Sequence, residues 1–85
     1  MTIQQAFGQV LRTIRQERGL SQEQLGFESG YHRTYISLLE RGKKNPSLNA
    51  IFELAAALQV SPSEMIRRVE TQVKAIPRRE RQERT

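Results

Sequence analysis

The segment 22–41 constrains the fold most, because its small and apolar residues suit two short helices that cross closely. Gly26 supplies the small residue that a close crossing needs, and Gly30 permits a tight turn. Three apolar residues have the spacing to pack the two helices together: Leu25, Ile36 and Leu39. Two short helices joined by a tight turn with glycine define a helix-turn-helix, so this spacing predicts that motif.

Start and stop signals divide the chain into five expected helices. Hydroxyl residues that cap helix starts precede four of them: Thr2, Ser21, Ser47 and Ser61. Gln5, Gln24 and Glu64 follow three residues after a cap, which predicts reciprocal capping boxes. The third helix is expected from near His32 to Arg41, and the fifth over about 62–76. No segment has the alternation typical of strands, so the fold class is all-α.

Apolar residues at helical spacing predict the core. In the first helix they are Phe7, Val10, Leu11 and Ile14. In the fourth they are Leu48, Ile51, Leu54, Ala55 and Leu58. In the fifth, Met65 and Ile66 are expected to close the core of one subunit, while later residues extend toward a partner.

Composition indicates one small soluble domain. The chain has 85 residues, 36% of them hydrophobic, and no cysteine, which excludes disulfides and thiolate metal sites. The start of the chain has no export-signal pattern, and no apolar run is long enough for a membrane span. These features favour a reduced, cytoplasmic protein without a membrane segment.

The net charge of +5 suits an anionic partner, although its distribution does not locate a binding surface. Residues 67–85 carry seven Lys/Arg against three Asp/Glu, whereas residues 1–66 carry seven against six. We therefore expect a domain over 1–76, followed by a basic, flexible tail over 77–85.

The stretch LSQEQLGFESGYHRTYISLLERGKKNPSLNAIFELAAALQVSP resembles the Xre family of Cro- and repressor-like helix-turn-helix regulators. Within that family, the segment HRTYISLLERGKKNPSL is most similar in sequence to the controller proteins of restriction–modification systems. The resemblance implies a five-helix lambda-repressor-like fold, with the third helix in the DNA major groove and dimers on paired operator half-sites. Two residues depart from the family pattern: Gly26 replaces the usual alanine, and Phe27 stands at a usually polar position.

The expected base-reading residues lie on the third helix, on faces that Ile36 and Leu39 leave outside. The guanidinium of Arg33 can donate two hydrogen bonds to guanine. Thr34 can bond a base edge or touch a thymine methyl group, whereas the Tyr35 ring can pack on the protein while its hydroxyl reaches DNA. By resemblance, Arg33, Thr34 and Tyr35 match the readers of controller proteins. Ser37 and Leu38 complete the base-reading set. A solvated helix face is the competing interpretation.

A second group is expected to contact the DNA backbone. Gln22 lies at a helix start, where free N–H groups attract phosphates. The loop after the third helix is rich in donors that suit phosphate oxygens. The whole group is Gln22, His32, Arg41, Lys43, Lys44 and Asn45. Simple surface solvation is again the alternative.

The family resemblance also pairs Arg15 with Glu40 in a structural salt bridge between the first and third helices. We expect this pair to orient the third helix and not to contact DNA.

Enzymatic, metal and cofactor functions find no support. His32 is the one histidine, and no glycine-rich phosphate loop or catalytic triad can be assembled. We expect a non-enzyme with no metal, no cofactor and no small-molecule ligand.

The fifth helix carries an apolar spacing that suits a partner helix, at Ile66, Val69, Val73 and Ile76. A homodimer would place two third helices about 34 Å apart, one DNA turn. The favoured function is a homodimeric regulator of transcription that binds double-stranded operator DNA. An antitoxin that also regulates its own operon is the alternative, and a protein-interaction module without DNA binding is a third.

Overall fold

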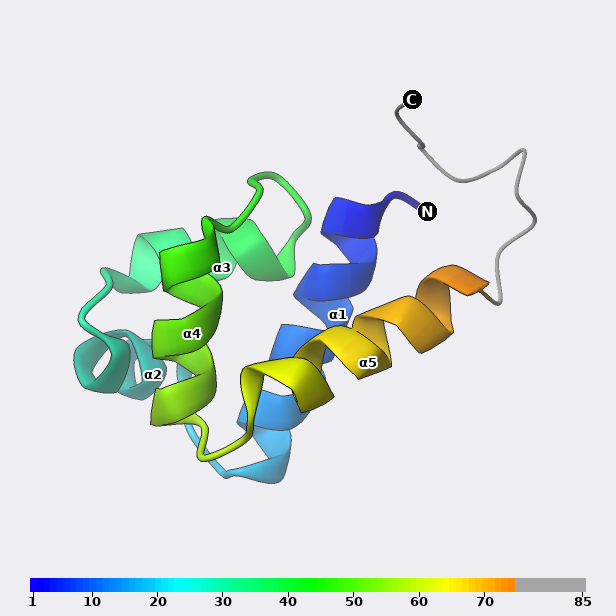
Figure 1. Cartoon of the computed structure of the whole chain (residues 1–85). Coiled ribbons are helices and arrows are strands. Elements are labelled where there is room, and N and C mark those ends of the chain that lie inside the picture. The colour runs from blue at the N-terminus through cyan, green and yellow to red at the C-terminus, as the bar shows by residue number, and fades with distance from the viewer. Residues whose placement is uncertain (75–85) are drawn as a thin grey trace.

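The computed structural model describes residues 1–74, which form five helices and no strand (Figure 1). Their bounds are α1 Ile3–Glu17, α2 Gln22–Ser29, α3 Arg33–Glu40, α4 Leu48–Ala57 and α5 Pro62–Lys74. The expected all-α class is confirmed. The expected end of the fifth helix at Ile76 and the tail 77–85 lie outside the described residues.

The helix starts follow the capping signals of the sequence. Thr2 with Gln5, and Ser21 with Gln24, form complete capping boxes at α1 and α2. The hydroxyl of Ser61 accepts a hydrogen bond from the Glu64 N–H at 3.0 Å. The Glu64 carboxylate, however, pairs with Arg67 and Arg68 on its own helix, where the sequence predicted a reciprocal cap.

One core joins all five helices. α1 contacts α3 and α5, α2 packs against α3 and α4, and α4 contacts α5. In Figure 1, α5 (yellow to orange) crosses α1 (blue), while α2 and α3 form the opposite part of the molecule. The largest fully buried side chains are Leu11, Ile14, Leu25, Ile36, Leu39, Leu54, Leu58 and Met65.

Three apolar residues of α4 and α5 depart from the expected core. Leu48 was predicted on the inner stripe of α4, yet it is 70% exposed, because it lies on the side of α4 that also carries the exposed Phe52 and not on the side of Ala50 and Leu54. Ile66 is 44% exposed and does not close the core, whereas Val69 is buried in it. Since α5 crosses α1, its inward face passes through Met65 and Val69. Val69 was predicted at a partner surface, and within one subunit it is buried in the core.

The helix-turn-helix forms over α2 and α3, and its two glycines have distinct structural reasons. A Cβ atom at Gly26 would lie 2.5 Å from the backbone oxygen of Tyr31, closer than side-chain carbons come to backbone. This contact explains why glycine stands at this position. Gly30 ends α2 with a φ of 83°, a left-handed conformation that glycine adopts without strain.

No helix within residues 1–74 is long and apolar enough to cross a membrane.

Replacing Gly8 by alanine tests the close approach of α1 to α3. A Cβ atom there would lie 2.4 Å from the backbone oxygen of Leu39 and 2.7 Å from that of Glu40. Backbone atoms cannot move aside cheaply, so Gly8→Ala is expected to lower the free energy of unfolding by about 1–3 kcal/mol in urea titrations. Gln9→Ala, at an exposed position of the same helix, is the control and should change it by less than about 0.5 kcal/mol. Equal stability of the two variants would contradict this packing.

Candidate nucleic-acid interface

An ion pair holds the end of α3 against α1. Arg15 donates from Nε to Glu40 Oε2 at 2.6 Å and from a terminal nitrogen to Glu40 Oε1 at 3.0 Å. The Arg15 side chain is 11% exposed and that of Glu40 is 3% exposed. The hydrogen bond to Glu40 raises the pKa of the Arg15 guanidinium, although burial opposes the shift. Two parallel bonds fix distance and orientation together, so the pair sets where α3 lies on α1.

The same pair reaches two further segments. The second terminal nitrogen of Arg15 donates to the backbone oxygen of Leu20 at 2.8 Å, which ties down the connection between α1 and α2. The Gln22 side-chain amide donates to Glu40 Oε1 at 3.1 Å. Gln22 was predicted to face a DNA phosphate, and the structure places its side-chain amide on the ion pair. Its sequence position at the start of α2 gave no signal of this contact.

The outward face of α3 carries the polar residues that the sequence selected. Arg33 and Thr34 are exposed, and Ser37 and Leu38 are half-buried. The Nδ1 atom of His32 accepts a hydrogen bond from the Thr34 N–H at 3.0 Å, so His32 caps the helix. In a neutral ring this contact places the proton on Nε2, which can donate to a phosphate oxygen.

Arg41 extends this face by one turn. Its Nε atom donates to the Ser37 hydroxyl at 3.3 Å, and its side chain is exposed. The sequence assigned Arg41 to the DNA backbone, but the contact with Ser37 aligns it with the expected base readers.

The following loop begins with two bonds to α3. The Gly42 and Lys43 N–H groups donate to the backbone oxygens of Leu39 and Leu38, at 3.0 and 2.9 Å. Lys43, Lys44 and Asn45 are all exposed. The loop therefore presents two cations and an amide beside the end of α3, as the sequence predicted.

Tyr35 has a packed ring. It stacks on Tyr31, with ring centroids 4.9 Å apart and planes inclined by 27°. The ammonium of Lys44 lies 6.0 Å from the Tyr35 ring centroid, at the outer limit of a cation–π contact. These contacts agree with the part of the expectation in which the Tyr35 ring packs on the protein.

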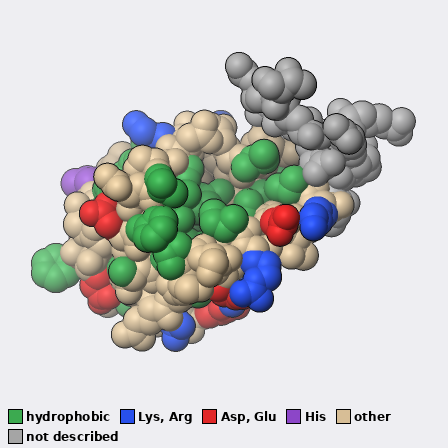
Figure 2. Space-filling model, in the orientation of Figure 1, with side chains coloured by type: hydrophobic (Ala, Val, Ile, Leu, Met, Phe, Trp, Pro, Cys, Tyr) green, Lys and Arg blue, Asp and Glu red, His purple; other side chains and the backbone are tan. Residues whose placement is uncertain are grey.

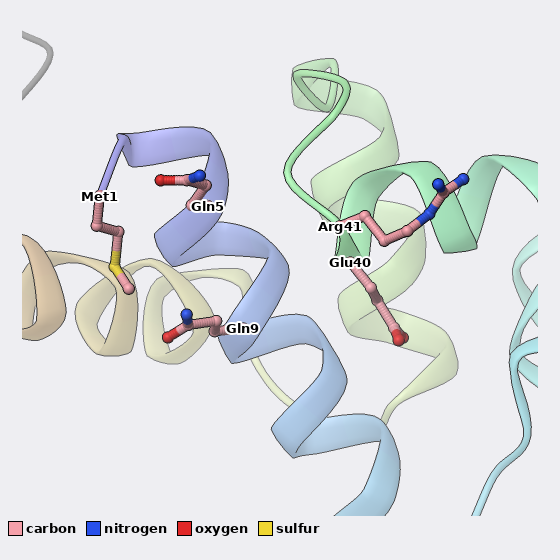
Figure 3. Close-up of a pocket in the computed structure, with 5 residues that line it drawn as sticks. All are labelled: Met1, Gln5, Gln9, Glu40 and Arg41. Atoms are coloured by element: carbon pink, nitrogen blue, oxygen red, sulfur yellow. The ribbon is translucent and has the colours of Figure 1, made fainter.

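A pocket of about 400 Å³ separates the start of α1 from the end of α3 (Figure 3). Met1, Gln5 and Gln9 line one side, and Glu40 and Arg41 leave the end of α3 in different directions. Within residues 1–74, no group of three or more His, Cys, Asp or Glu side chains is placed to hold a metal ion.

Sequence reasoning missed two residues that support this surface. Gly8 allows the close contact between α1 and α3, and Glu53 of α4 accepts a hydrogen bond from the Tyr31 hydroxyl. A glycine inside the first helix was a usable signal for close packing. No local pattern indicates a contact between Tyr31 and Glu53, which are 22 residues apart.

Comparisons with known proteins agree with this geometry. A helix-turn-helix family model matches residues 11–65. The control protein C.BamHI of Bacillus amyloliquefaciens is 48% identical over 61 residues, covering 71% of this chain and 75% of that protein. The crystal structure of the restriction–modification controller protein C.AhdI from Aeromonas hydrophila is 48% identical, with a TM-score of 0.72, over 73% of this chain and 94% of that one.

A second similar structure contains DNA. The tetramer of the controller protein C.Esp1396I in complex with its natural 35 base-pair operator is 28% identical, with a TM-score of 0.76. The match covers 82% of this chain and 92% of that one.

The chain belongs to the helix-turn-helix family of transcriptional regulators, since the family model covers more than half of its length. Within this family it resembles the restriction–modification controller proteins.

Replacing Glu40 by glutamine tests the ion pair. The variant leaves the guanidinium of Arg15 partly buried without its counter-charge, so the free energy of unfolding should fall by about 3 kcal/mol. Glu17→Gln is the matched control, because Glu17 meets Arg68 at 3.2 Å with both side chains more than a third exposed. Its loss should be about 0–1 kcal/mol in the same urea titration. Similar losses for both variants would mean that the α1–α3 pair contributes no more than a surface contact.

Proposed function

We propose that this protein binds operator DNA as a homodimer, with α3 in the major groove, and regulates transcription in the manner of a restriction–modification controller. The observation that carries the proposal is the arrangement of α3. Its inner residues Ile36 and Leu39 are fully buried, its end is held by the Arg15–Glu40 pair, and its outer face exposes Arg33 and Thr34. A helix anchored from behind can enter a groove without losing its position.

Base reading falls to the exposed start of α3. The Arg33 guanidinium can bond O6 and N7 of one guanine, and Thr34 lies beside it. Three half-buried residues lie nearer the protein: Tyr35, Ser37 and Leu38. We therefore propose that they extend less far toward the base edges. Arg41 lies on the same face as Ser37, and we propose that it contacts either a base edge or an adjacent phosphate.

Residues at the two ends of α3 are placed to contact the DNA backbone. His32 presents Nε2 at the start of α3, while Lys43, Lys44 and Asn45 project from the loop after it. Together these donors flank the reading face on both sides, and phosphate contacts of this kind set register and affinity. Gln22 bonds Glu40, so we propose that it acts mainly by fixing α3 against α2.

The dimer surface that we propose differs from the one expected for α5 alone. Five apolar residues form what we call the apolar face: Ile3, Leu48, Ile51, Phe52 and Ile66. Leu48, Ile51 and Phe52 share one side of α4. A pocket of about 230 Å³ is lined by Ile3, Ile51 and Ile66 among others. Figure 2 shows hydrophobic side chains gathered on this side of the molecule, over α4 and α5.

A second copy of this chain is the occupant that we propose for the apolar face. Contiguous exposed apolar side chains on a small protein mark an interaction surface, and relatives in the same family assemble on DNA. Val73 packs against the core at the edge of this region, whereas Ile76 lies outside the described residues.

The controller relatives favour the regulator over the antitoxin alternative, because two similar proteins, matched over 75% and 94% of their own lengths, are controllers. We propose that the protein has no catalytic activity, since a DNA-binding regulator of this family needs none. We also propose that it acts in the cytoplasm, where bacterial DNA lies.

Substitutions at Arg33 and Lys43 test the division between base reading and backbone binding. After selection of a site from a random DNA pool, Arg33→Ala should reduce preference at one base pair by about 1–3 kcal/mol. Lys43→Ala should weaken binding to selected and scrambled DNA alike. It should also reduce the salt dependence of binding by the amount expected for about one phosphate contact.

Arg67→Ala controls for loss of one positive charge, because this arginine is exposed on α5, away from α2 and α3. Equal loss on selected and scrambled DNA for Arg33→Ala would contradict its role as a reader. Failure of the wild-type protein to select any site would overturn the proposed function.

Substitution at Phe52 tests the dimer. Phe52 is 56% exposed in the apolar face, so Phe52→Glu should weaken self-association by about tenfold or more in sedimentation equilibrium. Phe27→Glu is the matched control, because Phe27 is 88% exposed on α2 and should not affect assembly. If Phe27→Glu dissociates the protein and Phe52→Glu does not, the dimer forms through a different surface.

A further inference from the structure

Two tyrosines and a glutamate connect α4 to the reading face of α3. Tyr31 lies in the turn after Gly30, and Tyr35 lies in the first turn of α3. Both rings are half-buried and pack against the core. Their stacking, at 4.9 Å between centroids, places the Tyr31 ring as the support on which the Tyr35 ring rests.

The Tyr31 ring is itself held from α4. Its hydroxyl donates a hydrogen bond to Oε1 of Glu53. This bond to Glu53 raises the pKa of Tyr31 to about 12, so the phenol remains a neutral donor throughout the physiological range. Ring torsion of a tyrosine changes little once its hydroxyl is bonded and its face is stacked. The order of contacts therefore runs from Glu53 to Tyr31 to Tyr35.

We infer that Tyr31 and Glu53 are positioning residues for DNA recognition, which fix the Tyr35 ring in its DNA-binding orientation before DNA arrives. The inference rests on the proposed function, because it takes Tyr35 to be a DNA-contacting residue. Holding a side chain in its bound conformation in the free protein reduces the entropy lost on binding. Lys44, whose ammonium lies 6.0 Å from the Tyr35 ring centroid, joins this support to the phosphate-binding loop.

Removal of Glu53 distinguishes the inference from a simple charge effect. A carboxylate lowers the affinity of a protein for the DNA polyanion, so its removal should strengthen binding on electrostatic grounds alone. If Glu53 positions Tyr35 through Tyr31, its removal weakens binding to the selected site. The two explanations predict opposite signs.

The first variant is Tyr31→Phe, which keeps the stacked ring and removes the hydroxyl. We expect about 3- to 10-fold weaker binding to the DNA site selected by the wild-type protein, the range that corresponds to the loss of one hydrogen bond. Binding to scrambled DNA should remain unchanged. Wild-type affinity for the selected site would overturn the inference.

The second variant is Glu53→Ala, with Glu28→Ala as its matched control. Both remove one exposed carboxylate, but Glu28 lies on α2 and lines a pocket together with Arg18 and Gln59. Glu53→Ala should weaken binding to the selected site, whereas Glu28→Ala should leave it equal or stronger. Equal strengthening by both variants would show that only charge matters and would overturn the inference.

A double-mutant comparison separates positioning from general stability. In a Tyr35→Ala background, Tyr31→Phe should no longer change affinity for the selected site, because the ring that it positions is absent. The same loss in both backgrounds would show an independent effect of Tyr31 and would overturn the inference. If Tyr35→Ala itself has wild-type affinity, then Tyr35 is not a reader, and the inference fails while site selection by the protein still stands.

A phenol titration followed by absorbance tests the hydrogen bond without DNA. The contribution of this bond should be complete below the ordinary tyrosine pKa of 10.0 and should be lost as the pH rises through about 12. One of the two tyrosines should therefore ionise near pH 12 in the wild-type protein and nearer pH 10 in Glu53→Ala. Identical titrations of the two proteins would overturn the inference.

Discussion

The ion pair between Arg15 and Glu40 decides where α3 lies, because three helices and a connection meet at this pair. Arg15 on α1 bonds both oxygens of Glu40 at the end of α3, and it also bonds the backbone before α2. Gln22 then brings the start of α2 to the same carboxylate. A helix of eight residues would be marginal alone, so α3 depends on these tertiary contacts for its shape and its direction.

The contact between α1 and α3 gives α3 two different sides. Its inner side is buried among apolar residues and approaches α1 at Gly8, where no side chain would fit. Its outer side is free to carry polar groups, since folding does not depend on them. The tyrosine pair lies at the border between these two sides, because both stacked rings are half-buried.

The apolar face lies on other elements than the reading face. It is built from α4, α5 and the start of α1, whereas the helix-turn-helix is α2 and α3. In the proposed function, assembly and DNA reading thus use separate surfaces of one small domain. Glu53 joins the two regions, because it stands on α4 beside Phe52 and bonds Tyr31 next to the reading helix. In this chain, α4 contributes both to the proposed dimer surface and to the support of Tyr35.

The amino-acid sequence by itself determined the five helices, the turn between α2 and α3, and the inner residues Leu25, Ile36 and Leu39, because capping and apolar spacing are local signals. It also indicated which side of α3 faces outward. The tertiary structure decided the rest. Only the crossing of α5 over α1 shows that Val69 is buried and Ile66 exposed, and only folding brings Glu53 to Tyr31 and Gln22 to Glu40. Contacts between distant residues depend on how helices pack, and a periodic pattern along one helix cannot specify its neighbours.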